Sequence, residues 1–221
     1  VFTNLTPEHL QAHGGDFLKY KEAKGKLFSA LEKNGSKTIL GKRIKKCIIA
    51  NSDNEHSDFY LSFEADEKFT YGLGNRAKFI AGNIKNTLSG LEFSVSNENF
   101  KINILGKFNV YNALPALVIG KIFDIPYSKI QEGFKNLKII PGRMEKISEG
   151  QKFLVFVDYA HEKEGMNAVL DTARDLVEET NGKVIVLLGA EGGGRDKAKR
   201  PILGEIAARK ADFVVISNVD P

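Results

Sequence analysis

The last third of the chain alternates apolar strand-like runs with amphipathic helical segments, and this alternation constrains the fold most strongly. The strand-like runs are residues 153–157, 183–188 and 211–217. The helical patterns between them cover residues 165–180 and 200–211, and Pro201 falls in the first turn of the second. Strand, helix, strand, helix, strand predicts an α/β fold with a right-handed, doubly wound half-domain of parallel sheet. In such a sheet, residues 153–157 (FLVFV) are expected to form a central strand buried on both faces.

The first half of the chain has a different pattern. Residues 17–33 form an amphipathic helical pattern with Tyr20 and Leu27 on its apolar side, and Asn34-Gly35 is expected to end it as a left-handed cap. Residues 36–103 are mostly strand-like, including 59–65, and a helix is expected only at about 75–85. We therefore predict the mixed and antiparallel flank of a central α/β domain.

Two further helices precede the last third of the chain. Residues 105–123 predict a helix whose apolar side includes Val110, Leu114 and Ile119, with a kink or a delayed start at Pro115. Residues 125–136 predict a helix with Ser128 as its N-cap.

Composition excludes several classes of protein. With 221 residues, 42% of them hydrophobic and 27% charged, the chain is an ordinary globular one. It has no apolar run near the ~20 residues that span a bilayer, and no signal-peptide pattern at its start. Cys47 is its single cysteine, which suits a reducing compartment. The net charge of +4 is spread among interleaved acids, and the basic run at 41–46 is interpreted as a solvated face, so we expect no nucleic-acid or membrane partner.

The stretch 141–161 carries the polar groups that suggest a site. A Pro-Gly break is followed by Arg143, and Asp158 comes directly after the apolar run at 153–157. Ligands of open α/β sheets bind at the carboxyl ends of strands. We interpret the stretch as a hinge that feeds polar groups into a cleft between two α/β modules, residues 1–140 and 141–221. The alternative is that both residues are ordinary surface residues near a domain boundary.

Other candidate residues also have simpler interpretations. His9 and His13 have the i,i+4 spacing of a metal pair, or belong to a polar helix face. Asn109 and Asn112 lie near a helix start, where Asn109 alone suits an N-cap. Lys24 is by itself an ordinary solvent-facing helix lysine. The glycine-rich loop at 189–199 fits an anion site or a flexible turn equally well.

Six motifs along the chain together resemble the Mur ligases, which are ATP-dependent enzymes that add amino acids to the peptide of the bacterial cell-wall precursor. The motifs are NLTPEHLQAHGG at 4–15, EAKGKLF at 22–28, GKFNVYNALPA at 106–116, PGRME at 141–145, VDYAH at 157–161 and GAEGGGRDKAKRP at 189–201. They occur in family order across nearly the whole chain. The match is nearest to the branch that adds the third residue of the peptide.

The resemblance implies part of a central ATPase-type domain at 1–140 and part of a Rossmann-like C-terminal domain at 141–221. It implies ATP-driven amide bond formation on UDP-N-acetylmuramoyl-dipeptide through an acyl phosphate, with magnesium as cofactor, in a monomeric cytoplasmic enzyme of peptidoglycan synthesis. The amino acid added is diaminopimelate or lysine. The chain is then expected to be a piece that lacks the UDP-binding domain, the P-loop and the C-terminal end, and to be inactive alone.

The resemblance also implies roles for individual residues. His9, and Lys24 as a carbamate, are expected to organise magnesium. The residues expected to bind the nucleotide are Asn109, Asn112, Arg143, Asp158, Tyr159 and His161. Substrate is expected to meet Thr3, Asn4, Arg195, Asp196 and Lys199. Of these, His9, Lys24, Arg143 and Asp158 are the expected catalytic set.

Departures from the family pattern leave alternatives open. VDYAHEKEG differs from the usual DYAHTPD, and SNVDP stands where the family has SDNPR. One alternative is another amide ligase of this fold, such as a folylpolyglutamate or cyanophycin synthetase. The other is a non-catalytic module that binds nucleotide or nucleic acid.

Overall fold

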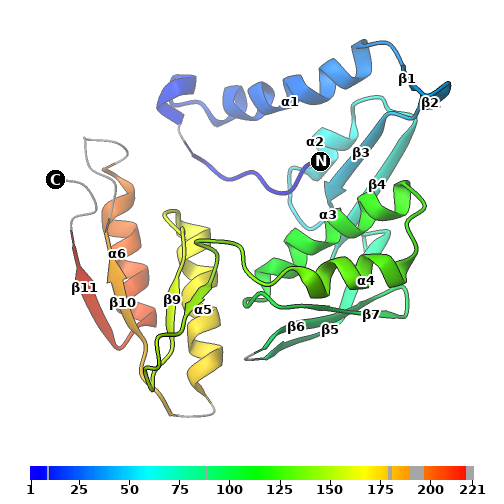
Figure 1. Ribbon diagram of the computed structural model, residues 1–221. Coiled ribbons are helices and arrows are strands. Elements are labelled where there is room, and N and C mark those ends of the chain that lie inside the picture. The colour runs from blue at the N-terminus through cyan, green and yellow to red at the C-terminus, as the bar shows by residue number, and fades with distance from the viewer. Residues whose placement is uncertain (9, 88, 179–180, 190–196, 218–221) are drawn as a thin grey trace. The chain divides into compact units, whose positions relative to one another are not determined.

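A computed structural model describes residues 1–8, 10–87, 89–178, 181–189 and 197–217 (Figure 1). By its internal contacts the chain forms two compact units. The first comprises Val1–Asn83, Phe93–Asn99 and Val110–Ile130. The second comprises Ile84–Glu92, Phe100–Asn109 and Gln131–Pro221.

Both halves of the chain contain helices and strands, and the two alternate regularly only from β9 (Val155–Val157) onward. The helices are η1 (Leu10–His13, a 3-10 helix), α1 (Phe17–Lys33), α2 (Ser57–Leu61), α3 (Phe108–Ile122), α4 (Tyr127–Asn136), α5 (Lys163–Glu178) and α6 (Lys199–Lys210). The strands are β1 (Lys37–Ile39), β2 (Lys42–Ile44), β3 (Cys47–Asn51), β4 (Glu67–Gly72), β5 (Phe79–Thr87), β6 (Gly90–Val95), β7 (Glu98–Ile102), β8 (Glu145–Ile147), β9 (Val155–Val157), β10 (Ile185–Leu188) and β11 (Phe213–Ile216). The predicted mixed α/β class is confirmed.

The largest sheet has the order β3-β4-β5-β6-β7. β3 and β5 are both parallel to β4. Ser96 and Asn97, which join β6 to β7, have φ angles of 51° and 67°. Two successive positive φ values form the two-residue turn that joins the strands of a tight hairpin, so β6 and β7 run antiparallel. The sheet is therefore mixed, as predicted.

Two predictions in this region were wrong. Residues 75–85 do not form a helix, because β5 begins at Phe79 and pairs in parallel with β4 through Tyr71. Residues 59–65 do not form a strand, because residues 57–61 form α2, whose Tyr60 is only 1% exposed. In both cases contacts with residues distant in the sequence override a weak local pattern.

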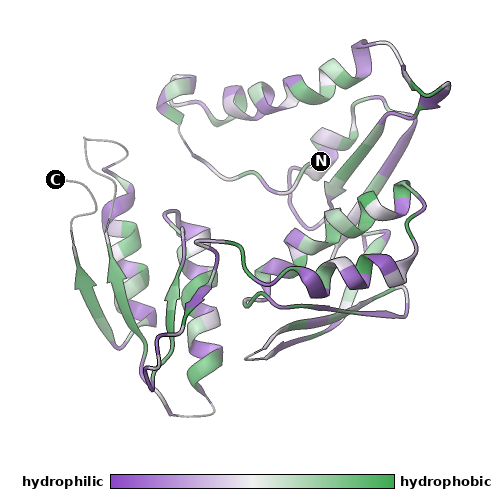
Figure 2. Ribbon diagram, viewed as in Figure 1, coloured by the Kyte–Doolittle hydropathy of each residue, from purple (hydrophilic) through white to green (hydrophobic). Residues whose placement is uncertain are grey.

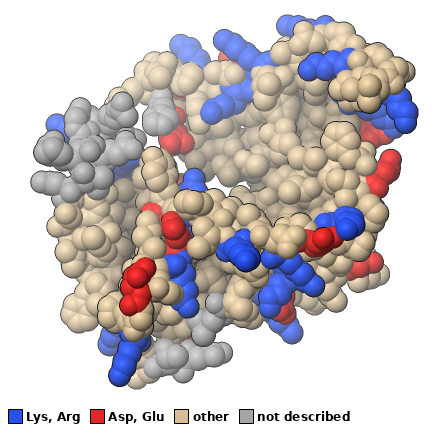
Figure 3. Space-filling view, viewed as in Figure 1, with Lys and Arg blue, Asp and Glu red and all other residues tan. Residues whose placement is uncertain are grey.

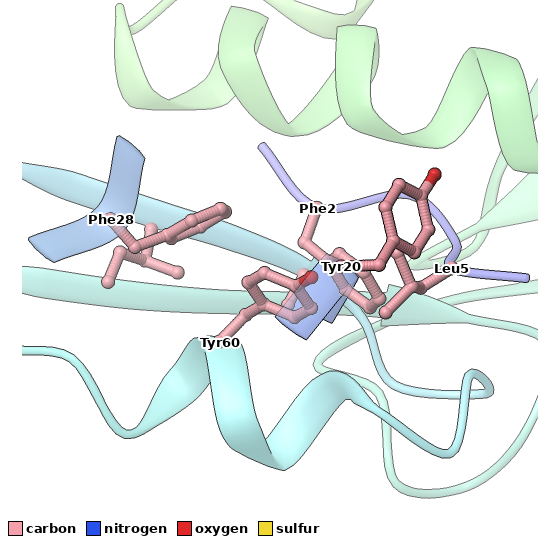
Figure 4. Packing of buried hydrophobic residues seen from close by; sticks show 7 residues of the cluster. Phe2, Leu5, Tyr20, Phe28 and Tyr60 are labelled. Atoms are coloured by element: carbon pink, nitrogen blue, oxygen red, sulfur yellow. The ribbon is translucent and has the colours of Figure 1, made fainter. Parts of the chain in front are cut away.

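The core of the first unit joins the amino-terminal segment, α1, α2 and β3. Phe2, Tyr20, Phe28 and Tyr60 are buried together, and the rings of Phe2 and Tyr60 stack with centroids 4.0 Å apart (Figure 4). Asp16 caps α1 by accepting the Leu18 N–H at 2.8 Å. This cap, which aligns α1, satisfies a backbone donor that the helix itself leaves unpaired.

The bounds of α1 were predicted correctly, but two details were wrong. Leu27 is 69% exposed, and Phe28 takes the core position beside it. Asn34 at the carboxyl end has φ −72° and ψ 150°, which is extended and not left-handed. Lys46 caps this end instead, donating from Nζ to the carbonyls of Glu32 and Asn34. A cation at a helix carboxyl end suits the exposed carbonyls there.

For α3 and α4, the expected inward position of Ile119 and the expected N-cap at Ser128 were wrong. α3 begins at Phe108 and continues through Pro115, so its start is not delayed to the proline. Val110 and Leu114 are fully buried, whereas Ile119 is 39% exposed. α4 begins at Tyr127, so Ser128 lies inside the helix and is not its N-cap.

The second unit contains the predicted order of strand, helix, strand, helix, strand. β10 and β11 are parallel, as expected. The core on one face of this pair is formed with α5 and α6 by the buried residues Met166, Leu170, Val184, Leu188, Leu203, Ile206 and Ala207. On the other side of the strands, Leu187 is 71% exposed and Phe213 is 60% exposed. Figure 2 shows the apolar character of both strands.

The prediction of a doubly buried central strand at residues 153–157 was wrong. Only Val155–Val157 form a strand, and β9 pairs antiparallel with β8. Phe153 is 69% exposed and Val157 is 48% exposed. An apolar run indicates a strand, but its partners and the cover on its faces come from other parts of the chain.

Surface charge and hydropathy agree with the composition. No helix among the described residues is long and apolar enough to cross a membrane. Basic and acidic side chains interleave on the face drawn in Figure 3. The basic run at 41–46 is largely exposed, and Arg43 pairs with Asp66 at 2.7 Å while Lys45 pairs with Glu67. This stretch is therefore a solvated, paired surface, as interpreted from the sequence.

Candidate functional site

Thr3 and Asn4 lie where the amino-terminal segment passes the carboxyl end of β3. Phe2 forms a parallel bridge with Ala50 of that strand. Asn51 then donates from Nδ2 to the carbonyl of Thr3 at 2.9 Å, which ties the segment to the strand. Both Thr3 and Asn4 are exposed. They stand at the edge of the sheet where ligands of parallel α/β sheets bind.

Asp53 lies just beyond β3 at the same edge, and its carboxylate joins three segments. It accepts the N–H of Leu73 at 2.5 Å, the N–H of Gly74 at 3.1 Å and the hydroxyl of Tyr111 at 3.0 Å. Burial and this hydrogen bond raise the pKa of Tyr111 to about 12. The sequence interpretation missed both Asp53 and Tyr111. The available signal is the polar run NSDN directly after the apolar strand CIIA.

Asn109 and Asn112 both lie near the amino-terminal end of α3. Asn109 is buried, and its Nδ2 donates to the carbonyl of Leu105 at 2.7 Å. Because α3 begins one residue earlier, at Phe108, Asn109 is not in the N-cap position. Asn112 is exposed. The simpler interpretation of Asn109 as an N-cap is therefore wrong, and its amide anchors the turn that precedes the helix.

Lys24 lies on the exposed side of α1, and its Nζ is 5.3 Å from the centre of the Tyr20 ring. The ring of His13 is 5.2 Å from the same tyrosine, at the end of η1. An ammonium group over an aromatic face is a favourable contact, and it holds the lysine side chain along the helix. His9, the expected magnesium ligand, lies outside the described residues.

The Pro-Gly break forms a tight turn that presents Arg143. The N–H of Arg143 donates to the carbonyl of Ile140 at 3.0 Å, and Gly142 has φ +69°. Proline followed by a residue with positive φ is the pattern of a type II turn, which explains why glycine stands at this position. Arg143 is exposed, and its guanidinium lies 5.6 Å from the centre of the Tyr159 ring.

Asp158 fastens this turn to the end of β9. One carboxylate oxygen accepts the N–H of Met144 at 2.8 Å, and the other accepts the N–H of Ala160 at 2.8 Å. The N–H of Tyr159 donates to the carbonyl of Gly142 at 2.8 Å. The two sequence motifs that contain Arg143 and Asp158 therefore lie together, and Asp158 has a clear structural role.

His161 and Lys199 both lie near Glu162. Nδ1 of His161 is 2.9 Å from the carbonyl oxygen of Tyr159, and its Nε2 is 3.7 Å from the Glu162 carboxylate. Nζ of Lys199 donates to the same carboxylate at 2.8 Å, and the lysine side chain is only 13% exposed. The loop after β9 is thus ion-paired to the start of α6. Arg195 and Asp196 lie outside the described residues.

Comparison with known proteins decides the family. Residues 1–120 match the family model of the Mur ligase middle domain, and residues 142–221 match that of the Mur ligase glutamate ligase domain. The chain belongs to the Mur ligase family. The resemblance inferred from the six motifs is thereby confirmed.

The chain is similar to bacterial proteins that are named as ligases. A "UDP-N-acetylmuramoyl-L-alanyl-D-glutamate--2,6-diaminopimelate ligase" of Caldanaerobacter subterraneus is 35% identical over 225 residues, which covers 100% of this chain and 43% of that protein. The protein of the same name in Bacillus licheniformis is 39% identical and is covered to 44% of its length. A solved structure of a ligase with this name is 27% identical with a TM-score of 0.63, covering 97% of this chain and 42% of its own. The chain therefore spans less than half the length of these relatives.

Proposed function

We propose that the gene product carrying this chain is an ATP-dependent ligase that adds the third amino acid to UDP-N-acetylmuramoyl-dipeptide during synthesis of the peptidoglycan precursor. The observation that carries the proposal is a match of 35–39% identity along the whole chain to Mur ligases named for this step. Because these relatives are named as diaminopimelate ligases, we propose diaminopimelate as the amino acid, with lysine as the alternative.

The turn at Arg143 suits the phosphates of a nucleotide. A guanidinium group stays charged at every working pH and presents several N–H donors in one plane, a geometry that fits phosphate oxygens. Arg143 is exposed, and the turn that carries it is fixed by the hydrogen bonds of Asp158. We propose that Arg143 binds nucleotide phosphate, that Tyr159 and His161 border it, and that Asp158 contributes chiefly by holding the turn.

The amino-terminal end of α3 carries groups suited to binding the base or the ribose of the nucleotide. Asn112 is exposed, and an amide group offers both a donor and an acceptor, as recognition of a base or ribose requires. Asn109 is buried against Leu105 and fixes the turn from which the helix starts. We propose that Asn112 touches the nucleotide directly and that Asn109 holds the geometry of its site.

Magnesium is implied by phosphoryl transfer, because the charge that develops on the transferred phosphoryl group must be neutralised. Lys24 is exposed on α1, so carbon dioxide can reach its amine, and a carbamate there would supply oxygen ligands of the kind magnesium prefers. We propose Lys24, as a carbamate, and His9 as the residues that hold the ion.

The rest of the proposal concerns substrates and organisation. We propose that Thr3, Asn4, Lys199, Arg195 and Asp196 contact the peptide substrate or the incoming amino acid. The ligase is divided at residue 140 into a central and a C-terminal domain. We also propose a monomeric enzyme in the cytoplasm.

The test is turnover by the natural gene product that carries these residues. ATP is supplied with UDP-N-acetylmuramoyl-dipeptide and a panel of amino acids that includes meso-diaminopimelate, lysine and glutamate. Phosphate release that requires both the dipeptide and diaminopimelate is the expected result. Release with a folate substrate and glutamate, but none with the dipeptide, would contradict the proposal and favour the folylpolyglutamate alternative.

A variant pair tests the role of Arg143. Arg143→Gln is expected to lower kcat/KM by about a hundredfold, because one cation is removed from a developing phosphoryl charge. Arg76→Gln is the matched control, since Arg76 is an exposed arginine that pairs with Asp58 on the surface. Equal activity of the two variants would contradict the proposal that Arg143 binds nucleotide phosphate.

A further inference from the structure

Asp53 connects three segments that are far apart in the sequence. It follows β3, it accepts the backbone N–H groups of Leu73 and Gly74 after β4, and it accepts the hydroxyl of Tyr111 on α3. β3 and β4 are parallel neighbours, so both loops lie at the same edge of the sheet. A single carboxylate therefore ties α3 to the edge at which ligands of such sheets bind.

The neighbouring glycines show how closely this carboxylate is surrounded. A Cβ atom placed on Gly72 would lie 2.7 Å from the Asp53 carboxylate, and one on Gly74 would also lie 2.7 Å from it. Such distances are too short for non-bonded atoms, so a side chain at either position would force the Asp53 carboxylate to shift. The end of β4 thus packs closely around the Asp53 carboxylate and its hydrogen bonds.

α3 needs a directional contact at Tyr111. The apolar side of the helix is anchored by Val110 and Leu114, both fully buried, but apolar burial has no direction of its own. Pro115 has no N–H to donate to the carbonyl of Tyr111, four residues earlier, so the helix lacks one internal bond at this point. The hydrogen bond between Tyr111 and Asp53 fixes the same residue from outside.

We propose that Asp53 is a positioning residue for the nucleotide: through Tyr111 it sets the place of Asn112, the next residue on α3. This inference rests on the proposed function, because it takes Asn112 as a nucleotide contact. Asp53 itself touches no substrate in this scheme. Its carboxylate is held by the two N–H groups, the phenol is held by the carboxylate, and the exposed amide of Asn112 is thereby presented in one orientation.

The experiment measures the dissociation constant of ATP with magnesium by calorimetry, on the natural gene product. Tyr111→Phe removes only the hydroxyl, and Asp53→Asn removes the charge and one acceptor. Each is expected to weaken ATP binding about tenfold, which corresponds to ~1.4 kcal/mol. Asp58→Asn is the matched control, because Asp58 bonds Arg76 of the nearby loop, and it is expected to leave the constant unchanged.

Two further readouts separate positioning from a general loss of structure. The KM for the amino acid is expected to stay unchanged in Tyr111→Phe while the KM for ATP rises. The double variant of Tyr111 and Asp53 is expected to be no weaker than the weaker single variant, because both changes break the same link. If Asp53→Asn fails to fold, Tyr111→Phe alone still decides the question.

The outcomes are distinguishable. An unchanged ATP constant in Tyr111→Phe, or a rise in both KM values together, overturns the positioning role and leaves the proposed function intact. Failure of the wild-type protein to bind ATP overturns the proposed function, and the positioning role with it. A selective rise in the ATP constants of the two variants, without additivity, supports both.

Discussion

Replacing Asp158 by Asn tests whether this residue holds the turn that presents Arg143. Asp158 uses one carboxylate oxygen for the N–H of Met144 and the other for the N–H of Ala160. An amide has only one oxygen, so asparagine keeps one of these bonds and directs its own N–H₂ group at the other donor. The substitution keeps the size and shape of the side chain, so any loss of stability comes from the changed hydrogen bonding and charge.

The magnitude follows from the lost bond. A hydrogen bond to a charged group contributes about 1.5–3 kcal/mol when buried, and Asp158 is only partly buried, so we expect about 1.5 kcal/mol of destabilisation. The backbone of Met144 makes the turn more sensitive to loss of this hydrogen bond. Met144 is 4% exposed, and its φ of +44° is a backbone conformation that residues other than glycine rarely adopt. For a domain of 60–100 residues, this loss lowers the melting temperature by roughly 6–12 °C.

Differential scanning calorimetry measures the effect, followed by the ATP constant of the folded variant. Asp171→Asn is the matched control, because Asp171 pairs across the surface with Lys210, and it is expected to cost less than about 0.5 kcal/mol. A melting temperature for Asp158→Asn equal to that of the control would refute the argument. Asp158 would then not be what fastens the turn.

Two other predictions concern the second unit. Leu203→Ala is expected to destabilise by about 2–4 kcal/mol in urea titration, whereas Leu187→Ala costs less than about 0.5, because Leu203 is 2% exposed and Leu187 is 71% exposed; similar losses would contradict the assigned core. The N–H of Val184, together with nearby cations, lowers the pKa of Asp212 to about 2 from 3.8. The ionised Asp212 therefore stabilises the fold fully above pH 4, and this stabilisation is lost as pH falls toward 2. Asp212→Asn is expected to reduce the slope of the free energy of unfolding against pH in this range. An unchanged slope would refute the prediction.

Elements with strong local signals could be predicted from the sequence alone. The period of apolar residues and the Asn34-Gly35 break fixed the bounds of α1, and Pro141-Gly142 fixed the turn before Arg143. The alternation of the last third gave the order of β9, α5, β10, α6 and β11 and the parallel pairing of β10 with β11. Local geometry decides these features, since helix periodicity, proline and glycine act over a few residues.

Which side chains act together depends on contacts between segments that are distant in the sequence. Nothing near Asp53 in the sequence indicates that it meets Tyr111, 58 residues away, or that Gly72 must make room for it. The pairing of Lys199 with Glu162 was likewise not predictable, although Lys199 lies in one recognised motif and Glu162 directly follows another. The partners of a strand, the cover on its faces and the bonds of a carboxylate are contacts between distant segments. Their energies exist only once the chain has folded, so local pattern cannot specify them.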